Sequence, residues 1–207
     1  MKQVMVNGVK TLAIAIICAI AGTAPALASP IHFPGNGHYY DFMNVSLSWD
    51  DANVAAQQQI YLGVAGHLAT VTTAAEQSFV YNQIYRPNIP VATDAYATWL
   101  GGYQVPASAE PAGGWTWATG EIWNYVNWGT GEPNNGVGFG LEPEDKLVMW
   151  GTGFWNDFVA GSFGAPGVGP IGYLIEFDTV PEPSALALTG FGAVVLTVIA
   201  RRNTHSK

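Results

Sequence analysis

Seven side chains that offer only oxygen acceptors or amide donors lie in one part of the chain: Glu132, Asn134, Glu142, Glu144, Asp145, Asn156 and Asp157. Five of them are carboxylates, and carboxylates at close range repel one another unless a cation lies between them. Oxygen ligands suit Ca²⁺, whereas Zn²⁺ and copper favour imidazole or thiolate. The cluster therefore predicts a calcium site, although a solvated acidic loop would have the same spacing.

Two other chemistries are disfavoured by the residues. Glycoside hydrolases use two carboxylic acids about 5–9.5 Å apart around the sugar. Calcium coordination would keep the carboxylates of this cluster ionised and leave no proton donor, so we do not expect an enzyme. His67, which follows Gly66, is expected to be packed and hydrogen-bonded. The four histidines show no spacing typical of a zinc site: His32, His38, His67 and His205.

Composition limits the function further. The chain has 207 residues, of which 49% are hydrophobic and 11% are charged, so it has enough apolar surface to fold. The formal net charge is −8, and residues 30–178 contain 14 acidic residues against two basic ones, Arg86 and Lys146. Because a nucleic-acid-binding protein needs a basic face to meet phosphates, we do not expect nucleic acid as a partner.

The first 28 residues are predicted to be a secretory signal peptide. Lys2 and Lys10 precede an apolar run over residues 12–21, and the small residues Ala26 and Ala28 precede the expected cleavage point. An apolar run of about ten residues is too short to cross ~30 Å of hydrocarbon. The only cysteine of the chain lies within this segment, so the exported protein is expected to have no disulfide.

Residues 180–207 have the pattern of a membrane anchor with a processing signal. Val180-Pro181-Glu182-Pro183 is followed by an uncharged stretch, residues 184–200, and then by Arg201 and Arg202. As a helix this stretch would be about 26 Å long, the short limit for a membrane span, and the arginines would keep the tail cytoplasmic. The segment resembles the PEP-CTERM sorting signal. This resemblance implies transient anchoring in the inner membrane and an exosortase partner that removes the tail, leaving the protein at the cell surface or outside the cell.

Residues 29–179 are predicted to form one α+β domain. Two helices are predicted, each beginning at a capping box. The first follows Ser48 and runs through Gln59, and the second follows Thr73 and ends before Pro87, because proline cannot continue a helix. Four apolar or aromatic runs predict strands over residues 38–43, 98–103, 146–150 and 171–177. The Gly-, Asn- and Trp-rich stretch between residues 113 and 140 is predicted to be a long functional loop.

Many separate landmarks closely resemble the C-type lectin-like domain in order and spacing. The resemblance covers residues 36–178 and rests on these segments: Gly37-His38-Tyr39-Tyr40, Ser48-Trp49-Asp50-Asp51-Ala52, Gly66-His67-Leu68-Ala69-Thr70, Thr98-Trp99-Leu100-Gly101-Gly102, Trp115-Thr116-Trp117, Asn127-Trp128, Glu132-Pro133-Asn134-Asn135, Glu144-Asp145 and Trp155-Asn156-Asp157. It implies an α+β C-type lectin-like fold with two helices, small antiparallel sheets and a long calcium-binding loop.

The resemblance also implies the site residues. The implied Ca²⁺ ligands, which would also contact the sugar, are Glu132, Asn134, Glu144, Asn156 and Asp157, with the Asp157 carbonyl oxygen in addition. Pro133 is implied to follow a cis peptide bond. The Glu132-Pro133-Asn134 triplet resembles the version linked with mannose, glucose, N-acetylglucosamine and fucose rather than galactose. Glu142 remains an alternative to Glu144, because the segment between Asn134 and Glu144 is longer than in well-known sugar-binding members.

Several positions depart from the family pattern. Ala56 and Ile175 stand where the family usually has one pair of disulfide-bonded cysteines, and Lys146 stands where another cysteine would follow. An apolar contact between Ala56 and Ile175 would replace part of the constraint of that disulfide, which is typically worth ~2–4 kcal/mol. Asn135 stands where a second calcium site often has Asp, so a second ion is not expected.

The eight tryptophans invite a role in stacking on sugars. The resemblance instead implies that three of them lie in or near the core: Trp99, Trp128 and Trp155. Three other aromatic residues flank the proposed site and are the better candidates for sugar contacts: Trp123, Tyr125 and Phe139.

Together these features predict a secreted or cell-surface, calcium-dependent carbohydrate-binding protein. Its predicted ligand is exopolysaccharide, bound through many copies of one weak site. The alternative is a structural or protein-binding component of the extracellular matrix, in which calcium only orders the long loop.

Overall fold

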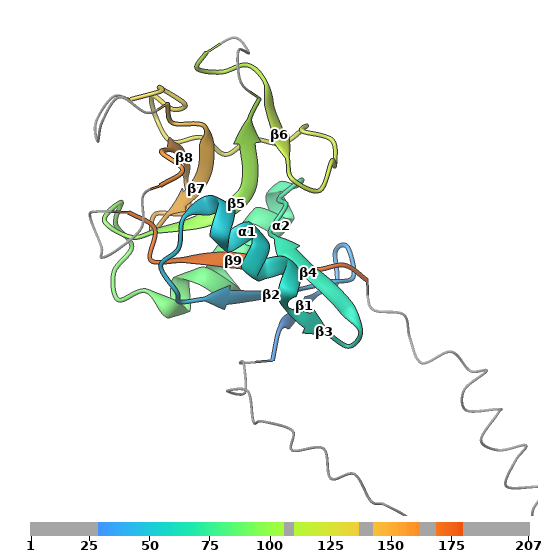
Figure 1. Ribbon diagram of the computed structural model, residues 1–207. Coiled ribbons are helices and arrows are strands. Elements are labelled where there is room, and N and C mark those ends of the chain that lie inside the picture. The colour runs from blue at the N-terminus through green and yellow to red at the C-terminus, as the bar shows by residue number, and fades with distance from the viewer. Residues whose placement is uncertain (1–28, 106–109, 137–142, 162–168, 180–207) are drawn as a thin grey trace, which may run out of the picture.

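Two short helices pack beside a branched sheet of nine strands in the computed structural model, which describes residues 29–105, 110–136, 143–161 and 169–179 (Figure 1). The helices are α1 (Trp49–Gln58) and α2 (Ala74–Phe79), and α2 continues into a π-helical turn, η1 (Val80–Tyr85), and a 3₁₀ turn, η2 (Arg86–Asn88). The strands are β1 (Ile31–Phe33), β2 (His38–Met43), β3 (Ile60–Tyr61), β4 (Val64–Leu68), β5 (Ala97–Gln104), β6 (Trp115–Trp117), β7 (Lys146–Trp150), β8 (Trp155–Phe158) and β9 (Gly172–Phe177). The predicted α+β class is confirmed.

Both helices begin at the predicted caps. The Ser48 hydroxyl accepts a hydrogen bond from the backbone N–H of Asp51 at 3.1 Å, and the Thr73 hydroxyl accepts one from Glu76 at 3.2 Å. These bonds satisfy backbone donors that a helix N-terminus leaves without a partner. The second helix ends before Pro87 as predicted, because α2 and η1 end at Tyr85 and Pro87 lies in the separate short turn η2, where proline is tolerated.

The sheet runs in the order β1-β2-β9-β5-β7-β8, with β4 also paired to β9 and β6 to β5. All pairs are antiparallel except β5 with β9, in which Thr98 lies opposite Gly172 and Trp99 opposite Tyr173. The expected small antiparallel sheets are therefore joined into one mixed sheet. A parallel pair needs a long crossover connection, and local sequence patterns do not report which distant strands it joins.

The four predicted strands are confirmed as β2, β5, β7 and β9, with bounds that agree to within one residue. The sequence missed the other five strands, of which β1 and β6 have three residues and β3 has two. Runs this short carry no clear alternation of apolar and polar residues. The omission matters most for β8, because this strand carries Asn156 and Asp157.

The central strands β5, β7 and β9 are buried on both faces. Consecutive strand residues point to opposite faces, and they divide between two core clusters accordingly. One cluster, which includes residues of η1, contains Leu100, Leu147 and Leu174. The other, which includes residues of α1, contains Trp99, Val148 and Tyr173. The two helical segments therefore cover opposite faces of the same sheet.

The positions where the resemblance implies cysteines are occupied by packed side chains. Ala56 and Ile175 are 0% and 1% exposed and belong to the same core cluster. They meet at Gly66, where an added side chain would clash with the Ile175 side chain and the Ala56 backbone. The Lys146 ammonium pairs with Asp145 at 3.2 Å and lies 5.0 Å from the centre of the Trp49 ring, a cation–π contact.

The chain enters at β1 and leaves after β9 in the lower half of Figure 1, whereas β6, β7 and β8 lie in the upper half. The predicted signal peptide, residues 1–28, and the predicted sorting signal, residues 180–207 with the span 184–200, lie outside the described residues. Within the described part of the chain, no helix is both long and apolar enough to cross a membrane.

Candidate functional site

Main-chain pairing brings the loop that follows β6 alongside β8. The backbone N–H of Trp155 donates to the carbonyl oxygen of Asn127 at 2.9 Å, and the N–H of Gly129 donates to the Trp155 carbonyl at 2.8 Å. Glu132 therefore comes close to Asp157, although 25 positions separate them in the chain. Glu144 reaches the same place from the residues that precede β7.

Asp157 fastens the loop to the sheet. Its side chain is 1% exposed, and its carboxylate accepts the backbone N–H groups of Asn134, at 3.1 Å, and Asn135, at 2.6 Å. Buried carboxylates need such donors, because they lose hydration when they are removed from water. Asp157 thus fixes the backbone on which Glu132 and Asn134 lie.

Glu144 closes the other side of the loop. Its carboxylate accepts the N–H of Gly136 at 2.7 Å, while its own backbone N–H donates to the Asn135 side-chain oxygen at 3.0 Å. A side-chain carbon added at Gly136 would lie 2.6 Å from the Asn134 Oδ1 and 3.0 Å from the Glu144 Oε2. Two of the predicted ligand oxygens therefore converge on a spot that glycine keeps open.

Within the described residues, no lysine, arginine or histidine pairs with Glu132, Glu144 or Asp157. Burial, followed by the repulsion of Asp157, raises the pKa of both Glu132 and Glu144 to about 7, and for Glu144 the Gly136 N–H opposes the rise. The Glu132 Oε2 is buried and has no hydrogen-bond partner among the described residues. A divalent cation would supply the missing charge and a partner for this oxygen.

The remaining predicted ligands are amides. Asn134 is exposed, whereas Asn156 is 6% exposed and donates its side-chain N–H to the carbonyl oxygen of Asp157 at 2.6 Å. That carbonyl keeps a second lone pair for another partner. The Glu132–Pro133 peptide bond is cis, as the resemblance implied. The structure therefore brings the predicted residues of the loop and of β8 to one place, whereas Glu142 lies outside the described residues.

Known proteins are similar to parts of this chain. No protein-family model matches the chain. The chain is similar to halomucin of Haloquadratum walsbyi, with 28% identity over 166 residues that make up 73% of this chain and 2% of halomucin. It is also similar to lithostathine of Bos taurus, with 34% identity over 94 residues, 45% of this chain and 49% of lithostathine. The chain thus spans only a small part of the first relative and about half of the second.

Solved structures give the fold. The cow C-type carbohydrate-recognition domain of CD23, solved in the presence of GlcNAc2Man3 oligosaccharide, aligns with a TM-score of 0.52 and 24% identity over 74% of this chain and 95% of that domain. The EPNH mutant of CEL-I aligns with a TM-score of 0.56 and 24% identity over 76% of this chain and 99% of that protein. The domain has the C-type lectin-like fold.

An aromatic platform lies under the site of this C-type lectin-like domain. The Trp155 ring is fully buried and makes edge-on contacts with three others, Trp117, Tyr125 and Trp128, whose centroids are 5.6–5.9 Å away. Such contacts add to the apolar burial that holds the loop on the sheet. The predicted core positions of Trp99 and Trp155 are confirmed, and Trp128 packs half-buried against the core.

The predicted sugar contacts are only partly described. Trp123 and Tyr125 are half-buried and pack against the core cluster. Phe139 lies outside the described residues. Contact of Trp123 and Tyr125 with a sugar stays a prediction.

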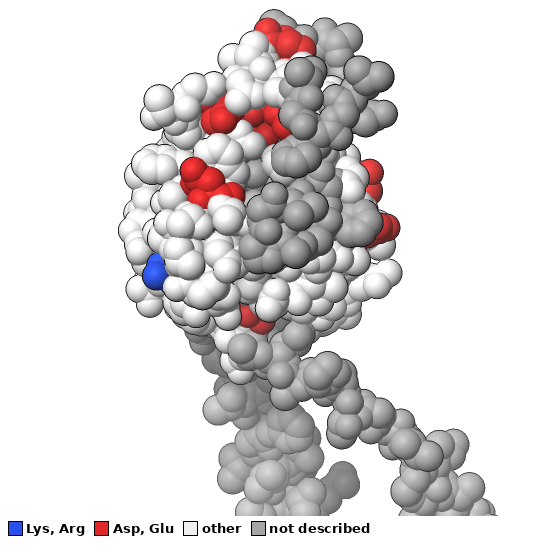
Figure 2. Space-filling view, turned by 90° about the vertical axis from the view of Figure 1, so that its left-hand side faces the viewer, with Lys and Arg blue, Asp and Glu red and all other residues white. Residues whose placement is uncertain are grey.

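Acidic side chains are spread over the face of the domain that Figure 2 shows, and basic side chains are scarce there. This agrees with the sequence, in which Arg86 and Lys146 are the only Lys and Arg residues between positions 29 and 179. Lys146 is engaged with Asp145 and the Trp49 ring. A cation from solution is therefore the natural counter-charge for the site.

The stability of the calcium-free domain is expected to depend on pH. Since the folded-state pKa of Glu132 and Glu144 is raised from 4.5 to about 7, the folded state holds protons more tightly than the unfolded chain between these values. The contribution of these two groups to the free energy of unfolding is therefore greatest below about pH 4.5 and is lost as pH rises from 4.5 through 7. Burial raises the pKa of Glu76 as well, with the same sign. In excess chelator we expect a higher thermal midpoint at about pH 5 than at about pH 7.5, and a smaller difference for Glu132→Gln; equal midpoints for the unmodified protein would refute this expectation.

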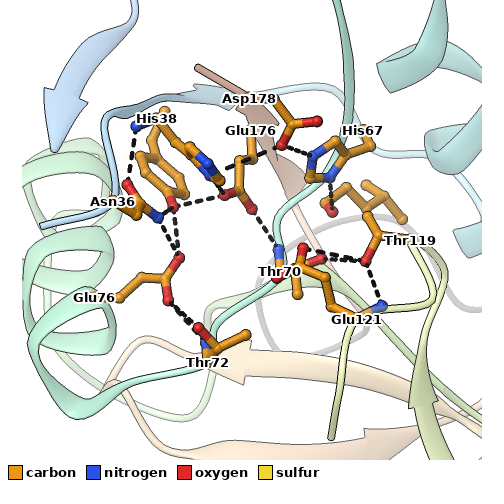
Figure 3. Close-up of polar contacts among 12 residues, drawn as sticks. Asn36, His38, His67, Thr70, Thr72, Glu76, Thr119, Glu121, Glu176 and Asp178 are labelled. Carbon is orange, nitrogen blue, oxygen red and sulfur yellow. Dashed lines mark hydrogen bonds and ion pairs between the residues drawn. The ribbon is translucent and has the colours of Figure 1, made fainter.

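Sequence reasoning missed a second polar cluster, which lies beside α2 (Figure 3). Glu76 and Glu176 are 2% and 1% exposed, and the Tyr40 hydroxyl lies 2.5 Å from the first and 2.7 Å from the second. Glu176 stands in an otherwise apolar or aromatic run, residues 172–177, all of which is buried. A charged residue in the middle of such a run is the signal that could have indicated a buried polar cluster.

Proposed function

We propose that this C-type lectin-like domain binds one Ca²⁺ and, through that ion, a carbohydrate. The proposed ligands are Glu132, Asn134, Glu144, Asn156 and Asp157. The main support is the buried Glu132 oxygen that has no partner among the described residues, together with the pKa of Glu132, which is raised by burial and by the repulsion of neighbouring carboxylates. An oxygen-only donor set of this kind fits Ca²⁺.

The bound ion would join the loop to the sugar. Ca²⁺ accepts about 6–8 oxygens, so a site with five protein side chains leaves room for two neighbouring sugar hydroxyls. Each hydroxyl can donate to a carboxylate and accept from an amide N–H. Glu132 and Glu144 would be the acceptors, and Asn134 and Asn156 the donors.

For the sugar we propose the mannose and glucose type, on the basis of the Glu132-Pro133-Asn134 triplet. One similar protein supports this choice, since the CD23 domain was solved in the presence of a mannose-containing oligosaccharide. The same triplet begins the EPNH sequence of the CEL-I mutant, and in this chain Asn135 follows it. A single exposed site of this kind is weak, so binding to exopolysaccharide would depend on many copies.

The location is proposed from the terminal segments alone. Residues 1–28 would direct export, and residues 180–207 would anchor the precursor in the inner membrane until an exosortase removes them. The protein would then act at the cell surface or outside the cell, as a binding protein rather than an enzyme.

Isothermal titration tests the proposal. Calcium is expected to bind with a dissociation constant of about 10⁻⁴–10⁻³ M, typical of extracellular modules. Mannose is then expected to bind only in the presence of calcium and in preference to galactose. Binding of mannose in excess chelator would contradict the proposal. Stabilisation by calcium with no ligand found on a broad glycan array would favour the alternative, a matrix component whose long loop is ordered by calcium.

A further inference from the structure

Two histidines that are far apart in the sequence lie on either side of strand β9. In the sheet register, Glu176 lies opposite Tyr40 of β2 and opposite His67 of β4. Residues directly opposite each other point to the same face, and so do residues two positions further along a strand. His38, His67, Glu176 and Asp178 therefore share one face, as Figure 3 shows.

The ligand atoms of three residues of this cluster lie close together, and the fourth residue, His67, contacts one of them, Asp178. The His38 Nδ1 is 2.5 Å from the Glu176 Oε1 and 3.8 Å from the Asp178 Oδ1, and the His67 Nε2 is 3.4 Å from the same Asp178 oxygen. One candidate ligand atom from each of His38, Glu176 and Asp178 lies within 4.8 Å of the other two. The Glu176 side chain is 1% exposed and that of Asp178 is 60% exposed, so the cluster has a buried floor and is open to solvent on one side.

The contacts of His67 show which of its nitrogens faces the cluster. Its Nδ1 lies 2.9 Å from the Leu68 carbonyl oxygen, and a carbonyl oxygen only accepts hydrogen bonds. The proton of a neutral His67 ring is therefore on Nδ1, and the Nε2 lone pair faces the Asp178 carboxylate. Two acceptors that face each other need a proton or a cation between them.

No arginine or lysine supplies that positive charge within the described residues. Arg86 donates to the carbonyl of Ile89, and Lys146 pairs with Asp145. The buried Glu176 and the nearby Glu76 add negative charge to the same region. A buried carboxylate is normally paired with a positive group or bound to a metal. The hydrogen bond to Glu176 raises the pKa of His38, so a proton on His38 occupies this place until a metal ion replaces it.

We propose that His38, His67, Glu176 and Asp178 bind one divalent transition-metal ion of the zinc type. Imidazole nitrogen is a ligand that Zn²⁺ prefers over Ca²⁺. Ligand atoms about 2.0–2.2 Å from a tetrahedral ion are about 3.3–3.6 Å apart, close to the 3.4 and 3.8 Å between Asp178 and the two imidazoles. The His38 Nδ1 and Glu176 Oε1 are hydrogen-bonded at 2.5 Å and would have to separate by about 1 Å when the ion enters. The histidines lack the sequence spacing typical of a zinc site, but this does not argue against the proposal. Strand pairing brings them together, so their separation along the chain is not constrained.

Neighbouring groups already orient the proposed ligands. The Glu176 Oε1 accepts the Tyr40 hydroxyl at 2.7 Å, and the Oε2 accepts the Thr70 N–H at 2.8 Å. The Leu68 carbonyl holds the His67 ring as described above. Metal-binding residues are commonly held by such outer hydrogen bonds, which fix both the rotamer and the tautomer.

The ion would fasten strands β2 and β4 to the C-terminal end of β9, where the chain leaves the domain. Residues 29–179 contain no cysteine, so no disulfide can do this. At a zinc concentration about 100 times the dissociation constant, we expect the thermal midpoint to rise by about 5–10 °C.

The test is a zinc titration of the full chain in saturating calcium, so that the proposed calcium site is already filled. We expect one zinc ion per chain at this site, and a cobalt complex with the strong visible absorption of tetrahedral coordination. His67→Gln and Asp178→Asn are each expected to weaken zinc binding by at least about 10–100-fold. Asp178→Asn is the safer variant for folding, because this side chain is exposed, and the unfolding midpoint in chelator reports whether each variant is folded.

His32→Gln is the matched control, because His32 lies on β1 against the Tyr39 ring and is outside the cluster. Its zinc affinity is expected to equal that of the unmodified protein. The proposal is overturned if zinc does not bind, if folded His67→Gln and Asp178→Asn bind as tightly as the unmodified protein, or if His32→Gln loses as much affinity as they do. It is also overturned if saturating calcium displaces the zinc. None of these outcomes bears on whether the domain binds a sugar.

Discussion

Replacing Asp157 with asparagine is expected to abolish the calcium response of the domain and leave it folded. The substitution keeps the size of the side chain and one acceptor for the backbone N–H groups of Asn134 and Asn135. It removes the negative charge that a cation would neutralise, so we expect calcium affinity to fall by at least about 100-fold. The measurement is calorimetric titration with calcium, followed by mannose, for which we expect no detectable binding.

The same substitution has a second expected effect. Because the charge of Asp157 raises the pKa of Glu132 and Glu144, its removal lowers both values and relieves repulsion in the calcium-free state. The thermal midpoint in chelator at about pH 7.5 should therefore not fall. Asp50→Asn, at an exposed position in the first turn of α1, is the matched control and should keep the full calcium response. Normal calcium affinity in Asp157→Asn would reject the proposed ligand set.

Truncation of Trp155 to alanine is expected to cause a large loss of stability. The ring is fully buried among Trp117, Trp123, Tyr125 and Trp128, and its Nε1–H donates to the Gln77 side chain at 2.8 Å. Removing a buried tryptophan side chain costs about 3–5 kcal/mol, and one unpaired polar group adds to this cost. For a domain of this size the thermal midpoint should fall by roughly 8–15 °C.

Phe154→Ala is the matched control for this prediction. Phe154 is the preceding residue and is also aromatic, but it is 52% exposed and its backbone carbonyl accepts from Trp150 irrespective of the side chain. Its removal should change the free energy of unfolding by no more than about 0.5 kcal/mol. Equal losses in the two variants, measured by thermal and denaturant unfolding, would show that the aromatic platform does not stabilise the loop.

Loss of the Trp155 ring is also expected to weaken the calcium site. Trp155 and Asp157 are two positions apart in β8 and point to the same face, so packing of the platform and anchoring of the loop depend on one short strand. If Trp155→Ala remains folded at low temperature, its calcium affinity should be lower than that of Phe154→Ala, because the loop anchored to β8 would be less rigid.

Much of the local structure was predictable from the sequence. Ser48 and Thr73 could be predicted as helix caps because each hydroxyl accepts a hydrogen bond from the backbone N–H only three residues later. Such a contact depends on neighbouring residues alone. The strands β2, β5, β7 and β9 are long enough to show an apolar or alternating pattern. The carboxylate and amide side chains around Glu132 and Asp157 also predicted a calcium site from residue type alone.

Other features depend on contacts between distant residues. The parallel pairing of β5 with β9 could not be predicted from the sequence, because no local pattern in either strand indicates which distant strand it pairs with. The sequence suggested for Asn135 only that it would not contribute to a second calcium site. In the structure its backbone N–H donates to Asp157 and its side-chain oxygen accepts the N–H of Glu144, so it links these two residues. The loop itself has no period that would predict this link.

The sequence by itself therefore determined which ligand atoms are available, where the helices start and which strands form the centre of the sheet, because these depend on a few neighbouring residues. Only the tertiary structure decided which acidic side chains meet without a counter-charge and that His38 and His67 flank Glu176. These outcomes follow from long-range strand pairing and loop closure, whose register is set by burial of the whole core rather than by any local pattern.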